Sequence, residues 1–430
     1  MHSNQVTRCV YVLLTAVIAP AAALRAAGDA EPPVLRPGVW RAWLESPGGD
    51  LPFELVFKER EADPENGRRE YDAWIINGAE RIAVPVVTVE AERVILDIDY
   101  YDSRIIAKTA NGATELDGVW KKKGRGDTVT EMTFHAVAGR HPRFLPPVDR
   151  ALSSDHRIDG RWIVHFSGDD APAVGVFETK PDGTATGTFL TTTGDYRFLA
   201  GDYDGRRLRL SAFDGAHAFL FLAQRNVDGS LRGDFWSRDT WHETWTATRD
   251  PKVTLPDAFS QTKRKDTVDL SALVFPDVDG VRRSLADPAL AGKARIIEVF
   301  GSWCPNCHDA SNYLVELQRR YGDRGLSIVG LAFELTGDFE RDARQVRIYG
   351  KRHGITYPVL IAGLADKATV SESFPLIDEL RSYPTTVFLD GSGSVRAIHT
   401  GFSGPATGNA HRQLRARFES IIEELLSEAR

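Results

Sequence analysis

The first half of this chain repeats itself, and this repeat restricts the fold more than any other feature of the sequence. The segment Gly38-Val39-Trp40 corresponds to Gly160-Arg161-Trp162, and further pairs follow in the same order. These pairs are Val56-Phe57 with Val176-Phe177, Gly78 and Arg81 with Gly194 and Arg197, Tyr101-Asp102 with Phe213-Asp214, Leu116-Asp117-Gly118 with Leu231-Arg232-Gly233, and Thr133-Phe134 with Thr244-Trp245. The spacing between partners varies near predicted turns, because loops tolerate insertions better than strands do. The repeat predicts two copies of one module.

Turn signals indicate that both modules are all-β. Asn or Asp followed by Gly is typical of tight hairpins between strands. Such pairs begin at Asn66, Asn77, Asn111, Asp182, Asp204, Asp214 and Asp228, and most have alternating or β-branched runs beside them. We therefore predict two tandem antiparallel all-β modules, residues 33–138 and 152–249, each a small barrel or sandwich. The Pro-rich stretch 139–147 joins them.

Aromatic residues in the modules have two possible roles. Every tryptophan except Trp303 lies there, and Trp40 aligns with Trp162. Large aromatic side chains commonly fill barrel cores, which is the interpretation we favour. The alternative is a binding pocket for an apolar ligand or a partner, with the C-terminal part of the chain as an accessory domain. Histidines in the modules (His135, His165, His217 and His242) lack the spacing of metal ligands, so we expect no metal and no cofactor.

The pattern changes after a linker, residues 250–269. Apolar strand-like segments now alternate with amphipathic helical ones, at residues 294–301, 307–321, 326–334 and 339–353. This alternation predicts an α/β domain over residues 270–430.

Cysteine usage indicates the chemistry of this domain. The chain has Cys9, Cys304 and Cys307. Two cysteines placed at random in the mature chain would stand three apart only about once in 200 trials. Structural disulfides would instead close long loops, where they stabilise most. We therefore expect Cys304 and Cys307 to form a reversible redox disulfide.

The N-terminus indicates export. Arg8 precedes an apolar run over residues 9–24 that ends in small residues, so residues 1–27 are predicted to be a signal peptide. The run is shorter than the roughly 20 residues that span a bilayer, although an uncleaved signal would leave a loose membrane tether. We expect an exported protein in the periplasm or another extracytoplasmic compartment. The formal net charge of −7 argues against nucleic acid as a partner.

Three motifs carry a family resemblance over about residues 270–430. They are EVFGSWCPNC at residues 298–307, YPTTVFLD at 383–390 and HTGFSGP at 399–405. With them the domain resembles the TlpA/ResA-like thiol:disulfide oxidoreductases of the thioredoxin superfamily. The resemblance implies a thioredoxin-like fold with an extra strand and helix near residues 326–362, protein thiol or disulfide substrates, and an upstream electron donor such as a membrane thiol carrier. It also implies that the protein reduces the disulfides of its substrates. Cytochrome c biogenesis, copper-site assembly and general disulfide repair are all compatible with this activity.

The two thiols have distinct expected roles. Cys304 should begin a helix, where unpaired N–H groups and the helix dipole lower a thiol pKa from about 8.5 toward neutrality. It would be the attacking thiolate. Pro305 suits the first helical position, because it has no N–H to leave unpaired. Cys307, one turn further in, would resolve the mixed disulfide.

Deprotonating Cys307 needs a base, and two glutamates are candidates. Glu298 lies on a strand that should be covered on both faces, where burial would raise its pKa. Glu334 ends the next strand, where related enzymes often have a glutamate. On the substrate side, the resemblance implies that Pro384 is cis and leaves the Tyr383 backbone, with Thr385 beside it, free to pair with an extended peptide.

Two further expectations concern the neighbours of the cysteines. Trp303 should cover the disulfide as well as pack. The motif Cys-x-x-Cys-His, ending at His308, also matches the attachment signature of c-type haem. The preceding strand and the Pro384 motif favour the redox fold instead, and we expect His308 to be an exposed helix residue.

Overall fold

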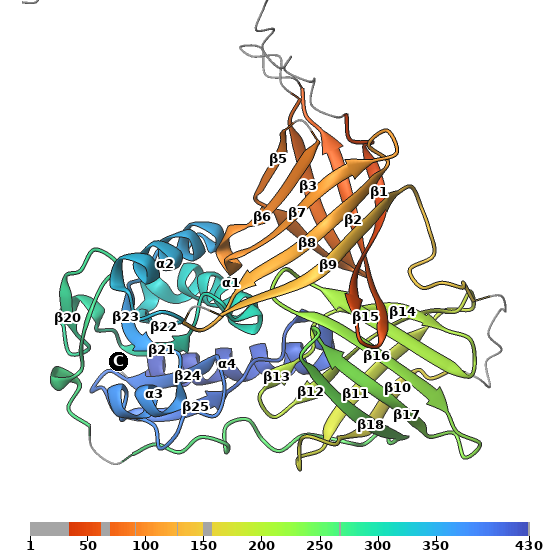
Figure 1. Cartoon of the computed structure of the whole chain (residues 1–430). Helices are drawn as coiled ribbons and strands as arrows, with labels where there is room; N and C mark the ends of the chain where they lie inside the picture. The colour runs from red at the N-terminus through yellow and green to blue at the C-terminus, as the bar shows by residue number, and fades with distance from the viewer. Residues whose placement is uncertain are drawn as a thin grey trace, which may run out of the picture.

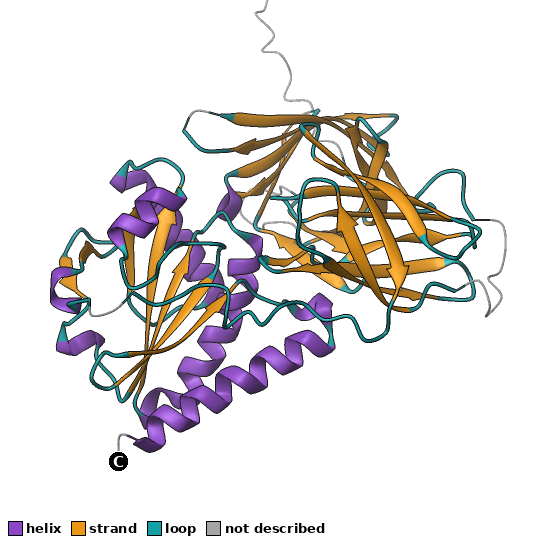
Figure 2. Cartoon of the chain, turned by 90° about the horizontal axis from the view of Figure 1, so that it is seen from below, coloured by secondary structure: helices purple, strands orange, loops and turns teal. Residues whose placement is uncertain are grey.

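The computed structural model of this chain describes residues 34–61, 69–90, 92–126, 128–148, 157–265 and 268–428. The predicted signal peptide, residues 1–27, lies outside the described residues. One part of the molecule consists mainly of strands, and the other contains α-helices and strands (Figure 2). No helix among the described residues is long and apolar enough to cross a membrane.

The first module contains one antiparallel sheet of nine strands within the described residues, in the order β4-β3-β2-β1-β9-β8-β7-β6-β5. Its strands are β1 (Gly38–Ser46), β2 (Gly49–Glu59), β3 (Tyr71–Asn77), β4 (Glu80–Val84), β5 (Val86–Glu90), β6 (Arg93–Ile98), β7 (Ser103–Ala110), β8 (Glu115–Lys123) and β9 (Val129–Ala138). Buried and half-exposed residues alternate along β3, as expected of a sheet with one face on a core.

The second module also contains nine antiparallel strands within the described residues. They are β10 (Gly160–Phe166), β11 (Ala173–Thr179), β12 (Thr184–Thr191), β13 (Gly194–Asp195), β14 (Leu199–Tyr203), β15 (Arg207–Phe213), β16 (Ala218–Arg225), β17 (Leu231–Ser237) and β18 (Trp241–Arg249). Because β11 pairs with both β10 and β12, this sheet closes on itself as a barrel. The predicted fold class is two barrel-like antiparallel sheets followed by an α/β domain, and the structure has this arrangement.

Equivalent contacts recur in the two sheets. Trp40 Nε1 donates to the carbonyl oxygen four residues earlier at 2.9 Å, and Trp162 Nε1 does the same at 2.8 Å. Both indoles are buried and contact the aligned phenylalanines, Phe57 and Phe177. These tryptophans fill cores, as the favoured interpretation expects.

The C-terminal domain has a mixed sheet in the order β23-β22-β21-β24-β25. Its elements are β21 (Ala294–Phe300), α1 (Pro305–Tyr321), β22 (Leu326–Glu334), α2 (Phe339–His353), β23 (Val359–Leu364), α3 (Lys367–Ser373), β24 (Thr385–Asp390), β25 (Val395–Thr400) and α4 (Asn409–Glu428). A small hairpin of β19 (Val274–Pro276) and β20 (Arg282–Ser284) precedes them. Short 3-10 helices are η1 (Asp99–Tyr101), η3 (Leu270–Ala272), η4 (Pro288–Leu290), η5 (Gly322–Arg324) and η6 (Pro405–Thr407).

Helices cover both faces of this mixed sheet. On one face, α1 and α4 pack on Ala294 and Ile296 of β21. On the other, Ile297 and Val299 pack with α3 and the segment before β21. Every residue of β21 is buried, as predicted for a strand covered on both sides.

The two sheets lie directly against this domain (Figure 1). The tip of the first sheet approaches α1 and α2, and Gln345 Nε2 of α2 donates to the Asp99 carbonyl at 2.8 Å. From the second sheet, the hairpin around Gly194 reaches the C-terminal domain, where Ser382 Oγ donates to the Thr193 carbonyl. The sheets therefore form part of the surroundings of the redox motif.

Candidate active site

The two cysteines form a disulfide at the start of α1. Their Cα atoms are 5.2 Å apart, and Cys304 Sγ accepts a hydrogen bond from the Cys307 N–H at 3.2 Å. Cys304 is the N-cap of the helix and Pro305 takes the first helical position, as the sequence predicts. Cys304 is 6% exposed and Cys307 is fully buried, so an incoming sulfur can reach only Cys304.

Aromatic residues flank the disulfide. Trp303 Nε1 donates to the Phe333 carbonyl at 3.0 Å, and its ring meets that of Tyr383 edge-on at 5.2 Å. Cys304 Sγ lies 3.7 Å from the Tyr383 carbonyl oxygen. Both aromatics and Pro305 line a pocket that opens on Cys304.

The Tyr383-Pro384 peptide bond is cis. Within the described residues, the Tyr383 N–H donates no hydrogen bond. The Thr385 hydroxyl donates to the Ser382 carbonyl at 2.8 Å and its side chain is buried. Thr385 thereby stabilises the loop that presents Tyr383.

Glu298 lies on the face of β21 that α1 covers, and it is 1% exposed. Its Oε2 accepts a hydrogen bond from Thr386 Oγ1 at 2.6 Å, and its Oε1 has no partner among the described residues. Burial raises the pKa of Glu298 to about 8, although the Thr386 hydrogen bond acts in the opposite direction. A carboxylate with one unbonded oxygen and a pKa near neutrality is suited to proton transfer.

Glu334 is fully buried at the end of β22. Its two oxygens accept hydrogen bonds from the Ser302 N–H at 2.8 Å and from Ser302 Oγ at 2.7 Å. Burial raises the pKa of Glu334 to about 8, against these two hydrogen bonds. Both bonds go to the loop just before Trp303, so Glu334 stabilises the position of that loop.

His308 is not the exposed residue that the sequence predicts. It is 4% exposed, its Nε2 lies 2.8 Å from the Ser302 carbonyl oxygen, and its Nδ1 lies 2.6 Å from Nε2 of His353. The ring also packs against Tyr100 and Tyr101 of the first sheet. The expectation was wrong because α2 of the same domain, through Tyr349 and His353, and the first module together cover the helix face that carries His308.

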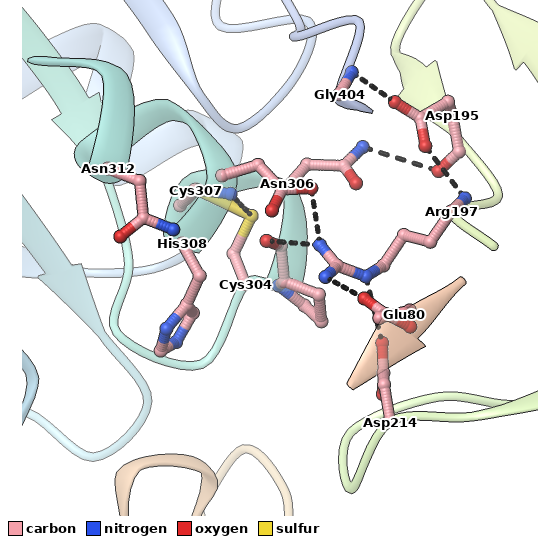
Figure 3. Close-up of polar contacts among 12 residues, drawn as sticks. Glu80, Asp195, Arg197, Asp214, Cys304, Asn306, Cys307, His308, Asn312 and Gly404 are labelled. Carbon is pink, nitrogen blue, oxygen red and sulfur yellow. Dashed lines mark hydrogen bonds and ion pairs between the residues drawn. A yellow bond between two sulfur atoms is a disulfide. The ribbon is translucent and has the colours of Figure 1, made fainter. Parts of the chain in front are cut away.

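Arg197 of the second sheet joins three parts of the molecule at the redox helix (Figure 3). Its Nη1 donates to the Pro305 carbonyl at 2.9 Å and pairs with Asp309 at 2.6 Å, and its Nη2 pairs with Glu80 of the first sheet at 2.6 Å. Asp214 lies 3.4 Å from Nε.

The carboxylates around Arg197 differ in their pKa values. Burial raises the pKa of Asp309 to about 7 and also raises that of Glu80, in both cases against the attraction of Arg197. Burial also opposes ionisation of Asp214, but His217 and Arg197 together hold its pKa below the usual range. The buried cluster thus contains one guanidinium and at least one firmly ionised carboxylate.

Comparison with known proteins agrees with this geometry. The protein-family model Redoxin matches residues 254–414. The C-terminal part of the chain is a redoxin domain. The match begins inside the predicted linker, where Thr262 Oγ1 lies 2.7 Å from Thr400 Oγ1 and Phe259 packs against Phe418.

Individual relatives match only part of this chain. Thioredoxin-like protein YneN of Bacillus subtilis is 30% identical over 124 residues, which are 29% of this chain and 65% of the relative. Thiol-disulfide oxidoreductase ResA of Bacillus cereus is 28% identical over 144 residues, 33% of this chain and 75% of the relative. The chain thus spans just under two thirds of YneN. A thiol:disulfide interchange protein from Chlorobium tepidum, of known structure, is 28% identical, with a TM-score of 0.28 and coverage of 38% of this chain and 99% of that one.

Sequence reasoning missed the residues that the β modules contribute. The sequence identifies Arg197 only as the repeat partner of Arg81, which instead lies over the ring of Trp74. Lys122 and Arg238, which also line the pocket over Cys304, were not considered. The repeat alignment paired Gly194 and Arg197 with Gly78 and Arg81, but no local pattern indicates that this segment contacts the redoxin domain.

Proposed function

We propose that this protein is an extracytoplasmic thiol:disulfide oxidoreductase that reduces disulfides of protein substrates with the Cys304/Cys307 dithiol. The supporting observation is the disulfide at the start of α1, with Cys304 Sγ at the helix N-cap, accepting from the Cys307 N–H and lining a pocket. This is the arrangement that stabilises a thiolate at position 304.

The proposed reaction proceeds in two exchanges. The Cys304 thiolate attacks one sulfur of a substrate disulfide, so that a Cys304–substrate bond forms and the other substrate sulfur leaves with the electron pair. Cys307 then loses its proton and displaces the substrate sulfur from Cys304. The substrate gains two electrons, and the protein becomes the disulfide form. A dithiol donor, such as a membrane thiol carrier, returns it to the reduced form.

Glu298 is the proposed base for Cys307, and Glu334 a positioning residue. Both glutamates have a raised pKa and lie on the side of the sheet that α1 covers. They differ in their bonding, because both oxygens of Glu334 accept from Ser302 whereas one oxygen of Glu298 is unbonded among the described residues. The unbonded oxygen favours Glu298.

The β modules are proposed to be repeats of one unit that together form the wall of the substrate pocket opposite the cysteines. Their equivalent tryptophan contacts support the repeat. The contacts of Arg197 and of the Thr193 carbonyl with the redoxin domain support the role in the pocket.

The decisive experiment is insulin reduction coupled to dithiothreitol, with the full mature chain. Wild type should accelerate precipitation of the insulin B chain, and Cys304→Ser should not exceed the uncatalysed rate. Cys307→Ser should instead accumulate a mixed disulfide on Cys304, detectable by mass. Equal rates for wild type and Cys304→Ser would contradict the proposed function.

A further inference from the structure

The pocket over Cys304 has two walls of different origin. Its volume is about 400 Å³. Trp303, Cys304 and Tyr383 of the redoxin domain form one side, and Lys122 of the first sheet with His217 and Arg238 of the second sheet form part of the other. A substrate sulfur must therefore pass between the β modules and the redox helix to reach Cys304.

The wall formed by the modules carries uncompensated positive charge. Within the described part of the chain, no carboxylate oxygen lies within salt-bridge distance of Lys122 or Arg238. Arg238 Nη1 donates only to the neutral hydroxyl of Thr130, at 3.3 Å. Lys122 and Arg238 line the same pocket, and burial together with Arg238 lowers the pKa of Lys122 to about 8.

The acidic group whose charge acts on Lys122 is engaged elsewhere. Asp214 favours the charged form of Lys122 through its field, but its carboxylate lies 3.1 Å from His217 Nδ1 and 3.4 Å from Arg197 Nε. The contrast with Lys121, the preceding residue of β8, is informative. Lys121 Nζ pairs with Glu131 at 2.6 Å. In a chain with a net charge of −7, two partly buried cations without a carboxylate partner beside a reactive sulfur indicate an anion site.

The dimensions of the pocket indicate what carries the anion. Because Cys304 is only 6% exposed, a broad folded surface cannot reach it while the modules occupy this position. The Tyr383 N–H on the pocket floor, which donates to no described residue, can pair with an extended backbone. A volume of about 400 Å³ accommodates only a few residues of such a segment.

We propose that the pocket selects extended, unfolded segments whose cysteine has acidic residues beside it, with Lys122 and Arg238 binding the carboxylates. This inference rests on the proposed function and names its substrate class. Charge pairing across such an interface acts on the association rate and on selectivity.

The test uses the pre-reduced full chain in single-turnover reactions, followed by quenching and counting of free thiols. The probes are symmetric disulfides of two short cysteine peptides, one flanked by Glu and one by Lys, with glutathione disulfide as an anionic small molecule and hydroxyethyl disulfide as a neutral one. Wild type should react at least about tenfold faster with the Glu peptide than with the Lys peptide. The double variant Lys122→Gln/Arg238→Gln should lose this preference, so that the ratio of its rates with the two peptides approaches one.

Matched variants complete the design. Lys121→Gln removes a paired cation from the same strand and should leave the preference unchanged, whereas Lys122→Glu should reverse it. Arg238→Lys retains the positive charge and should preserve most of the preference for the Glu peptide. An unchanged preference in the double variant would overturn the inference. So would an equal loss of rate in the double variant with glutathione disulfide and with the Glu peptide. Failure of wild type to react with any of the four disulfides would instead contradict the proposed function.

Discussion

Arg197 Nη1 donates to the Pro305 carbonyl oxygen at 2.9 Å, so a side chain from the second β sheet fixes the first turn of the redox helix. The same guanidinium also pairs with Asp309 on that helix and with Glu80 on the first sheet. Arg197 thereby connects both modules to the redox helix. The modules and the redoxin domain are expected to be energetically coupled through it.

Arg197→Ala should destabilise the protein strongly. Removing one partner of a buried ion pair leaves charges uncompensated and costs about 3–5 kcal/mol. The matched control is Arg81→Ala, the repeat counterpart, whose exposed guanidinium lies 4.0 Å above Trp74 and whose loss should cost no more than about 1 kcal/mol. Urea unfolding measures both. Equal losses would show that Arg197 has no special role in joining the domains.

Stability should depend on pH through Glu298 and Glu334. Burial raises the pKa of each to about 8 in the folded protein, so both favour the protonated form. The stabilisation that their raised pKa values give to the folded state is complete below about pH 4.3, the pKa of a glutamate in the unfolded chain. It is lost as pH rises through about 8. As the pH is raised from 5 to 9, the free energy of unfolding of Glu298→Gln and of Glu334→Gln should therefore each rise by more than about 1 kcal/mol relative to that of wild type.

The exposed Glu372 provides the control for this measurement. Glu372→Gln should show the same pH dependence of the free energy of unfolding as wild type. If Glu298→Gln and Glu334→Gln also follow the wild-type curve, then neither glutamate has a raised pKa in the folded protein.

The kinetics of resolution should distinguish the two glutamates. With Glu298 as base, the decay of the mixed disulfide should accelerate as pH rises through about 8, and Glu298→Gln should slow it by about 100-fold and flatten this profile. Thr386→Val removes the hydrogen bond that lowers the pKa of Glu298, so its profile should shift to higher pH. Quenched-flow mass analysis measures the decay. A flattened profile in Glu334→Gln alone would assign the base to Glu334.

Much of the redox centre could be predicted because its determinants are local. The motif around Cys304 specifies an N-cap, a proline at the first helical position and a resolving thiol one turn later, and burial of Glu298 follows from the apolar strand around it. The contact of Arg197 with Asp309 joins residues 112 apart in the chain. Neither residue has a local pattern that identifies the other, because this contact depends on how separately folding units dock. The exposure of His308 was mispredicted because the residues that cover it, on α2 and in the first module, are also distant in the sequence.

Covalent haem should be absent from the purified protein despite the Cys-x-x-Cys-His motif. Both ring nitrogens of His308 lie at hydrogen-bond distance from Ser302 and His353, and Cys307 is fully buried. Coordinating iron would break the bond to Ser302 or to His353. Expression together with a cytochrome c maturation system should therefore yield no pyridine haemochrome spectrum. An α-band retained after denaturation and acid-acetone extraction would contradict this expectation.

The repeat itself can be tested at two aligned glycines. A Cβ atom at Gly118 would lie 2.0 Å from the Ile106 carbonyl oxygen, and one at Gly233 would lie 2.0 Å from the Leu222 carbonyl oxygen. Because strand backbone cannot move aside as a flexible side chain can, Gly118→Ala and Gly233→Ala should each cost about 1–3 kcal/mol or more. Gly350 on α2 has open space around it, so Gly350→Ala should stabilise the protein by about 0.4–1 kcal/mol. Urea unfolding compares the three, and a large loss at only one of the aligned glycines would contradict the structural equivalence of the two modules.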